Sequence, residues 1–484
     1  MPPFWYTALA MNKAFVLAMA AYAAALWAAG LGLKRKAGSL DAFFLASREL
    51  GAGRVAFSLC ASWIGAASLL VSTDEACRDG LGAIWIVGVP AVATLLILTL
   101  LARPIRAAAG LTPSEIMARA CGKTAGLMTT VLVVWYMTVL AASQMVAAGP
   151  FLGEFLKLAP LPSLVLAAAI VMVYSAAGGL RAVARTHVLQ FALLLAGLVG
   201  MVVALTGRTT WGAVKAAAAA GGKAGFLDPL AGGPRNMLIA LSFVLAWTVS
   251  PIAWQRMQAA RSEAASRRGT AGAAILLGLF YSGIVVAGLF FLPLFPDRGT
   301  GAPLVTRFIA LSPKSGLSAL LFVTVLAAIF STMDAALNAG AFTLTKDLAA
   351  PRAAAGTEGR PLRLARASTA ALALVALLIA ARLGDILKTL GLASAIMAEG
   401  LLVPGVAALF LKKKAPLAGL LGLGLGGAYA ILSFLGEAGL PILPIPAWPR
   451  SLPLGLGLGA AGFAVGLAVE RARASRRAPE TPSS

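Results

Sequence analysis

Residues 316–347 read GLSALLFVTVLAAIFSTMDAALNAGAFTLTKD, a stretch too long and too apolar for an ordinary soluble helix. Its second half nevertheless carries Ser331, Thr332 and Asp334, which lipid penalises unless they find partners inside the protein. Ser331 and Thr332 follow the Ala328 carbonyl by one helical turn, so three hard oxygen atoms are available to a small cation. A sodium site is one interpretation. Hydroxyls that bond back to the preceding turn or join two helices are the other.

The composition of the 484-residue chain indicates a polytopic, all-α membrane protein, because 60% of its residues are hydrophobic and only 12% are charged. Its three cysteines, Cys60, Cys77 and Cys121, are not spaced as a disulfide framework or a metal cluster. The net charge of +22 comes mostly from basic residues in loops predicted on one side of the membrane. This pattern is typical of membrane orientation, and no nucleic-acid partner is predicted.

Apolar segments predict about thirteen membrane spans. They cover residues 14–33, 54–73, 82–102, 125–148, 161–177, 187–205, 237–254, 271–294, 316–338, 368–383, 387–411, 416–436 and 452–469. The basic cluster at 34–36 follows the first segment, which therefore reads as an uncleaved span rather than a signal peptide. The bias of Lys and Arg among the loops predicts the orientation, with the N-terminus outside and the C-terminus inside. The membrane is expected to be the cytoplasmic membrane.

Two spans contain helix-breaking residues. The second reads RVAFSLCASWIGAASLLVST with Gly65 near its middle, and the seventh contains Ser250-Pro251. If spans two to six and seven to eleven form two five-span repeats, each broken helix is the first member of its repeat, as an inverted repeat predicts. Packing and simple kinks are the alternative explanation for each break taken alone.

These features predict five regions along the chain. They are an N-terminal extra span with an inner loop (1–52), a first repeat (53–205), an outer loop with the second repeat (206–411), two C-terminal spans (412–470) and a basic, disordered inner tail (471–484).

Five segments resemble successive motifs of the sodium/solute symporter family, in the family's order and spacing. They read AFFLASRELG, FSLCASWIGAASLL, YSAAGGLRAVARTHVLQ, SPIAWQRMQAARS and LAAIFSTMDAALNAGAFTLTKDL, within residues 41–350. This family includes bacterial sodium symporters for proline, galactose and sialic acid. The resemblance implies the leucine-transporter-type 5+5 inverted-repeat fold, with one extra span before the core and two after it.

The resemblance also implies a set of sodium ligands. Backbone carbonyls of the broken second span and groups of the ninth span would bind the ion, which assigns Ala61, Ile64, Ala328, Ser331 and Thr332. The chain departs from the family pattern at His187, where an aspartate is usual, and this change argues against a second sodium ion. A histidine at the inner surface without a coupling role is the simpler interpretation of that residue. Trp63 replaces an aspartate of the proline transporters, so proline specificity is not implied.

Polar and aromatic residues at the depth of the two breaks are the candidates for contact with a solute. They are Ser68, Gln144, Trp247, Thr248, Ser250 and Glu399. Each has an alternative role in interhelical hydrogen bonding or packing. Asp74 and Glu75 are expected at the outer mouth, as a solvated loop end.

The sequence therefore predicts a sodium-coupled symporter that imports a small organic solute by alternating access, with one sodium ion per solute. No catalytic constellation and no cofactor besides the coupling ion is predicted; the partners are the solute, sodium and the lipid bilayer. The alternatives are a proton-coupled transporter of the same fold, a membrane sensor without net flux, and a membrane enzyme. An enzyme or respiratory-type subunit would need buried histidines or paired acids.

Overall fold

The computed structural model describes residues 13–31, 44–108, 112–295, 301–313, 315–349, 360–382, 384–437 and 444–476. Regular structure in these residues is helical, apart from one isolated bridge between Leu50 and Ala260. Ten of the described helices are long and apolar enough to cross a membrane. The predicted all-α class is confirmed.

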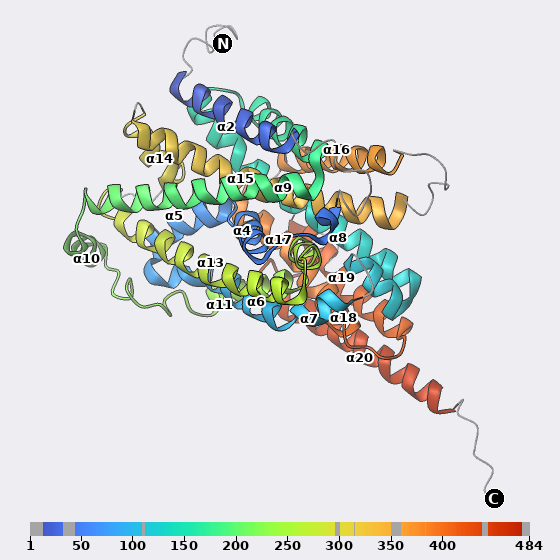
Figure 1. The fold of residues 1–484 in the computed structure, drawn as a ribbon. Coiled ribbons are helices and arrows are strands. Elements are labelled where there is room, and N and C mark those ends of the chain that lie inside the picture. Colours follow the sequence, from blue (N-terminus) through green and yellow to red (C-terminus); the bar gives the residue numbers. More distant parts are fainter. Residues whose placement is uncertain are drawn as a thin grey trace, which may run out of the picture.

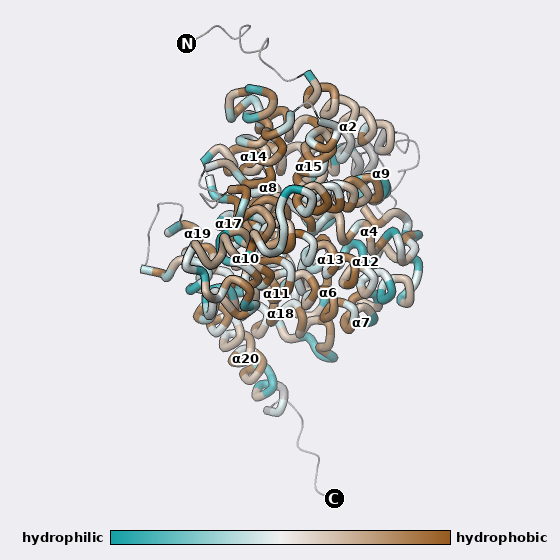
Figure 2. Tube along the Cα trace, turned by 90° about the vertical axis from the view of Figure 1, so that its left-hand side faces the viewer, coloured by the Kyte–Doolittle hydropathy of each residue, from teal (hydrophilic) through white to brown (hydrophobic). Residues whose placement is uncertain are grey.

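Most helices lie side by side along a common direction, with α10 (Trp211–Ala220) and α14 (Leu304–Ala310) at one end of the bundle (Figure 1). Hydrophobic residues dominate along the helices, whereas hydrophilic residues gather at helix ends and turns (Figure 2). Large apolar side chains such as Leu100 and Leu279 are 78% and 69% exposed. Such exposure is expected of surfaces that face lipid.

The first half of the chain is built from the following elements: α2 (Lys13–Leu31), η2 (Ala46–Arg48), α4 (Ala52–Trp63), η3 (Ala67–Val71), α5 (Ser72–Asp79), η4 (Gly80–Trp85), α6 (Gly88–Leu100), α7 (Ala102–Ala107), α8 (Pro113–Leu156) and α9 (Pro160–Thr206). The predicted break lies between α4 and η3. Ile64 there leaves the helical conformation, with φ −86° and ψ 81°. Helix α8 bends at Gly122, whose φ of 86° favours glycine.

Helix α9 contains both the fifth and the sixth predicted spans. The Trp27 indole donates to the Ile170 carbonyl at 3.3 Å, and the Gln190 amide donates to the Tyr22 hydroxyl at 3.1 Å. Trp27 and Tyr22 are only five residues apart on α2, whereas a straight helix would separate residues 170 and 190 by about 30 Å. The α9 element therefore turns back on itself, and both of its parts lie against α2.

The second half contains α11 (Gly233–Thr248), α12 (Pro251–Gln258), α13 (Glu263–Phe291), α15 (Gly316–Leu344), η5 (Thr345–Ala349), α16 (Arg360–Ala380), α17 (Ile386–Ile396), η7 (Met397–Leu401), α18 (Leu402–Ala408), α19 (Pro416–Glu437) and α20 (Leu452–Arg476). The second break lies at Val249 and Ser250. Pro251 then opens α12, where a missing backbone N–H costs nothing.

Helix α15 occupies the centre of the bundle and packs against α2, α4, α8, α9, α12 and α16. Its side chains are buried almost continuously from Leu321 to Thr343. Several polar residues of its second half have internal partners: Asn338, for example, accepts from the Gln255 amide at 3.1 Å.

Every predicted span overlaps a described helix, whereas the count of thirteen, the inverted relation between the halves and the domain boundaries stay predictions. The basic cluster at 34–36 and residues 477–484 of the predicted tail lie outside the described residues, whereas residues 471–476 of that tail are not disordered but continue helix α20. The expectation of a solvated loop end at Asp74 and Glu75 is wrong, because both residues belong to α5. Glu75 is buried and pairs with Arg78, and Asp74 accepts from the Leu304 N–H at 2.8 Å.

Candidate functional site

The first helix break and the centre of α15 meet at Ser331. Its Oγ lies 2.7 Å from the carbonyl oxygen of Ala61 on α4, and 2.6 and 3.2 Å from those of Ala327 and Ala328 on its own helix. A hydroxyl has a single proton to donate, so it serves only one of these three carbonyls at a time. Several oxygen atoms thus surround one point between two elements that are 270 residues apart.

Thr332 supplies a further oxygen beside this point. Its Oγ1 is buried and has no hydrogen-bond partner among the described residues. It lies 3.0 Å from the position that a Cβ would take on Gly65, so it faces the break. A buried hydroxyl without a partner costs free energy unless a ligand or water satisfies it.

The end of α4 contributes backbone carbonyls to the same place. The last four carbonyls of a helix have no partner within the helix, and Ala61 belongs to this group in α4. Ile64 is fully buried where the chain leaves the helix. The structure therefore brings Ala61, Ile64, Ser331 and Thr332 to one buried region, with Ala328 one turn before Ser331. All their oxygens are hard, uncharged donors that suit Na⁺.

Gln144 on α8 satisfies the other side of the break. Its Oε1 accepts from the backbone N–H of Ala66 at 2.9 Å, and its Nε2 donates to the Ser143 hydroxyl at 3.0 Å. Since lipid offers no hydrogen bonds, an unwound segment at membrane depth needs partners from the protein or from a water-filled cavity. This amide therefore allows the helix to stay open at Gly65.

A cavity of about 40 Å³ adjoins the break. Its described lining residues are Ser62, Trp63, Gly65, Ala67, Ser68, Val87, Tyr136, Leu140, Gln144, Trp247, Ser250, Ile252, Thr332 and Leu390. Four of the six predicted solute contacts, Ser68, Gln144, Trp247 and Ser250, line this cavity. Because Thr332 lines it as well, the cavity and the cluster of oxygen ligands share a wall.

The other two predicted solute contacts do not line the cavity. Thr248 follows Trp247 by one residue, so its side chain leaves the helix in a different direction and does not reach the cavity. Its hydroxyl donates to the Val244 carbonyl of the same helix at 2.8 Å. Glu399 belongs to the π-helical turn η7 and lies beside Gly455 of α20, with the Ser451 hydroxyl 3.4 Å away. These two residues lie away from the cavity.

Sequence reasoning missed two aromatic residues of the cavity wall. The ring centroids of Trp63 and Trp247 are 5.4 Å apart, and the Tyr136 side chain hydrogen bonds to that of Trp247. Trp63 is next to the break, and Tyr136 precedes Gln144 by eight residues, which returns it to the same face of α8. The helical spacing from Gln144 was therefore a usable signal for Tyr136.

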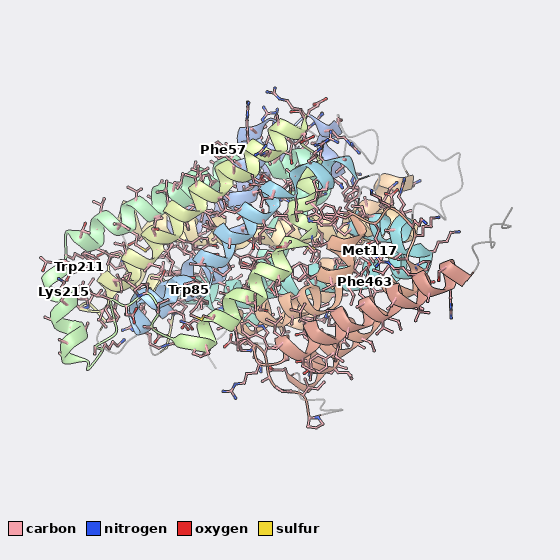
Figure 3. The ribbon with its side chains drawn as sticks, turned by 90° about the horizontal axis from the view of Figure 1, so that it is seen from below. Phe57, Trp85, Met117, Trp211, Lys215 and Phe463 are labelled. Atoms are coloured by element: carbon pink, nitrogen blue, oxygen red, sulfur yellow. The ribbon has the colours of Figure 1, made fainter. Side chains whose placement is uncertain are left out.

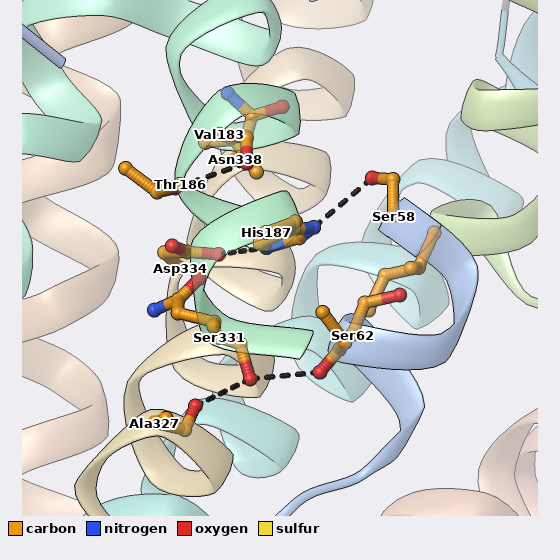
Figure 4. A network of polar contacts seen from close by, with 12 residues as sticks. Ser58, Ser62, Val183, Thr186, His187, Ala327, Ser331, Asp334 and Asn338 are labelled. Carbon is orange, nitrogen blue, oxygen red and sulfur yellow. Dashed lines mark hydrogen bonds and ion pairs between the residues drawn. The ribbon is translucent and has the colours of Figure 1, made fainter. Parts of the chain in front are cut away.

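His187 is buried in the bundle, and the expectation of an inner-surface histidine is wrong. Its Nε2 lies 2.8 Å from Asp334 Oδ1, and its Nδ1 lies 3.0 Å from Ser58 Oγ (Figure 4). The cause is tertiary: this part of α9 lies between α4 and α15, and polar side chains of all three helices meet there. The cluster begins one helical turn beyond Ser331.

Arg256 of α12 completes this cluster. Its side chain is fully buried, with Nε donating to Ser58 Oγ at 2.9 Å and Nη1 to the Ile252 carbonyl at 3.0 Å. Asp334 is the acid whose charge acts on the guanidinium. A charge in this position requires a partner, so Arg256 and Asp334 compensate each other inside the protein.

The broken helices and the buried oxygen cluster define the chain as a membrane transporter. A family model described as the sodium:solute symporter family matches residues 43–426, and the chain belongs to this family. It is therefore a multi-pass membrane protein of a sodium-coupled transporter family, as its sequence motifs predicted.

Two solved structures share the fold. A Na⁺-coupled sialic acid symporter in a substrate-bound, outward-open state has a TM-score of 0.79 at 16% identity; the match covers 94% of this chain and 97% of that one. A nucleobase-cation-symport-1 family transporter, closed with bromovinylhydantoin bound, has a TM-score of 0.53 at 18% identity, covering 88% and 94%. A search of curated protein sequences found no match.

Proposed function

We propose that the chain is a sodium-driven symporter that imports a small uncharged organic solute across the cytoplasmic membrane. The observation that carries the proposal is the contact between Ser331 and the Ala61 carbonyl, beside the unpartnered hydroxyl of Thr332. Ala61, Ile64, Ala328, Ser331 and Thr332 would bind the sodium ion. No covalent chemistry is needed for this function.

The proposed ion site links two elements and one cavity. Ligands from both α4 and α15 mean that sodium binds tightly only when the break lies against α15. An ion with this preference shifts the population of conformations toward that arrangement. In alternating access, such a shift couples ion binding to the change between the outward-open and inward-open states. Because Thr332 faces both the ion site and the cavity, sodium binding also orders the solute site.

The lining of the cavity supports an uncharged solute. None of the described lining residues has a charged side chain, so a charged solute would lose its hydration without a compensating partner. Trp63 and Trp247 offer aromatic faces, while Gln144 and the nearby serines offer hydrogen bonds. A volume of about 40 Å³ holds only a few water molecules, so the walls must separate to admit a solute.

One sodium ion per solute follows from the neighbouring cluster. Asp334 is the carboxylate nearest to Ser331 along α15, and it already lies next to His187 and compensates Arg256. A second sodium ion there would compete with a permanent cation. Reversal potentials in proteoliposomes measure the ratio, and a value near two ions per solute would contradict this step.

The proposed orientation has the N-terminus outside. The described ends of α16 and α20 and the turn at 412–414 carry many of the basic residues, which positive-inside placement puts in the cytoplasm. Lys413→Cys should react with an impermeant thiol reagent only after cells are made permeable. Labelling of that cysteine in intact cells would reverse the assignment.

The decisive experiment is uptake into proteoliposomes from a panel of uncharged, zwitterionic and anionic solutes, with and without an inward sodium gradient. We expect an uncharged member of the panel to accumulate only when sodium is present outside. Accumulation driven by a proton gradient without sodium would favour the proton-coupled alternative. Solute binding without flux would favour the sensor.

A further inference from the structure

A second cavity lies at the start of α4, at the opposite end of this helix from the break, and shares no lining residue with the cavity beside the break. It has a volume of about 190 Å³ and is enclosed by η2, the first turn of α4 and the middle of α9. Its lining residues are Ala46, Glu49, Leu50, Arg54, Arg181, Ala184 and Arg185. Three arginines face one acid there, so the walls carry a net positive charge.

The arginines of this cavity are arranged in two ways. Arg181 is anchored, because its Nη2 lies 2.6 Å from Glu49 Oε2 and 3.5 Å from the Ala46 carbonyl. Arg54 and Arg185 are exposed, and neither forms an ion pair within the part of the chain that the structure describes. Guanidinium groups with open donors bind phosphate oxygens in pairs, which a lysine ammonium does not do.

The backbone beside the cavity is strained. Ala46, Ser47 and Arg48 have φ values of 49°, 54° and 57°, a left-handed turn that residues with a Cβ seldom adopt. This turn brings the Ala46 carbonyl and Glu49 against Arg181. Burial lowers the pKa of Arg106 on α7, and the charge of Arg48 lowers it further, so Arg106 is another basic side chain near this turn.

Exposed apolar side chains lie one helical turn further along both helices. Phe57 follows Arg54 on α4 and is 36% exposed, and Val188 follows Arg185 on α9 and is 40% exposed. The Phe57 ring packs on Phe191 of α9 with centroids 5.5 Å apart. Nitrogen-tipped side chains project from the end of the molecule beside Phe57 (Figure 3). The arginines would contact the charged headgroup of a lipid, and the apolar side chains one helical turn further along would contact its acyl chain.

We propose that this cavity binds the phosphate group of an anionic phospholipid, with Arg54, Arg181 and Arg185 as its ligands. Basic pockets between membrane helices at the cytoplasmic side are suited to such headgroups. A lipid held there joins the first turn of α4 to α9. Because Ala61 lies in the last turn of α4 and Ile64 follows its end, the lipid stabilises one position of the helix that carries half of the proposed ion site.

Lipid retention by the purified full-length chain tests the proposal independently of transport. Native mass spectrometry with added phosphatidylglycerol or phosphatidylcholine gives the affinity for each lipid. We expect preference for phosphatidylglycerol, and a loss of about tenfold in Arg54→Gln/Arg185→Gln. The matched control is Arg471→Gln/Arg473→Gln, two exposed arginines at the end of α20, which should retain the lipid like the unmodified chain.

Further arms separate the possible sources of the phosphate and the role of folding. Inorganic phosphate that binds as tightly as the lipid would overturn the lipid assignment, as would unchanged retention in the Arg54→Gln/Arg185→Gln chain. Arg54→Lys/Arg185→Lys should keep part of the affinity, because charge remains and paired hydrogen bonding is lost. If the glutamine variant fails to fold, the lysine variant and the comparison of the two lipids test the site instead. Equal retention of phosphatidylglycerol and phosphatidylcholine by the unmodified chain would reject the site.

Discussion

The two helix breaks, at Gly65 and at Ser250-Pro251, each interrupt a predicted span, yet their surroundings differ. At the first, the Gln144 amide of α8 accepts from the N–H of Ala66, and the Ser331 hydroxyl of α15 donates to the Ala61 carbonyl. At the second, the Trp254 indole, which belongs to the helix that follows the break, donates to the Thr248 carbonyl at 2.9 Å. The Ser250 N–H also bonds locally, to the Trp247 carbonyl at 3.1 Å.

The first break has local hydrogen bonds too, but it also depends on groups from other helices, while the second is satisfied largely by its own neighbours. Oxygens that depend on distant helices can gain or lose a cation when those helices move. The second break instead forms a stable wall, with Trp247 and Ser250 lining the cavity. From this difference we propose that the ion binds at the first break and that the solute contacts both.

The largest effect should come from removing both hydroxyls at the first break. Ser331→Ala/Thr332→Ala deletes two of about five sodium ligands, so sodium affinity should fall roughly 100-fold, since a hydrogen bond or ligand to a charged group is worth about 1.5 kcal/mol or more. The sodium dependence of uptake measures this. Thr343→Ala, which removes a buried hydroxyl bonded to the Ala339 carbonyl of the same helix, is the control. Equal sodium affinity in the double variant and the control would refute the ion site.

Gly65→Ala should weaken both sodium and solute binding. The added Cβ would lie 2.8 Å from Gln144 Oε1 and 3.0 Å from Thr332 Oγ1, so both groups must move. Such overpacking costs about 1–3 kcal/mol, and we expect about a tenfold loss for each ligand. In Gly278→Ala the nearest atom, of Val92, is 3.6 Å away, so this variant should behave like the unmodified chain. If only solute binding changed in Gly65→Ala, the shared wall would be disproved.

Gln144→Leu should reduce solute affinity by up to about tenfold and lower the melting temperature. It leaves the N–H of Ala66 without its partner, which costs about 1–3 kcal/mol, and removes a polar group from the cavity. Uptake kinetics and a thermal melt are the measurements. Gln190→Leu removes a buried amide that bonds to Tyr22 and does not line the cavity, so it should affect stability alone. Equal solute affinity in both variants would remove Gln144 from the solute site.

The smallest effect is expected at the second break. Trp254→Phe removes the indole N–H that serves the Thr248 carbonyl, at a cost of about 1 kcal/mol. Solute affinity should fall a few-fold while sodium affinity stays the same, as measured by uptake at varied sodium concentrations. A loss of sodium affinity as large as in Gly65→Ala would show that the two breaks share the ion, and the contrast between them would fail.

Local pattern explains why much of this protein was predictable. Apolar length identifies membrane helices because the bilayer sets it, and Gly65 and Pro251 indicate breaks through their own backbone chemistry. The hydroxyls of Ser331 and Thr332 stood out because lipid excludes them. The family motifs then supplied the carbonyls of the second span as partners, and the structure places Ala61 beside Ser331.

What the sequence by itself determined is therefore the membrane class, the helices, the two breaks and the polar residues that must find partners. Only the tertiary structure decided which partners these are. His187 meets Asp334 because α9 turns back toward α15, and Glu399 turns to α20 because a π-helical turn changes its direction. Hydropathy reports how deep a residue lies along the membrane normal, but it carries no information about which neighbouring helix the residue faces.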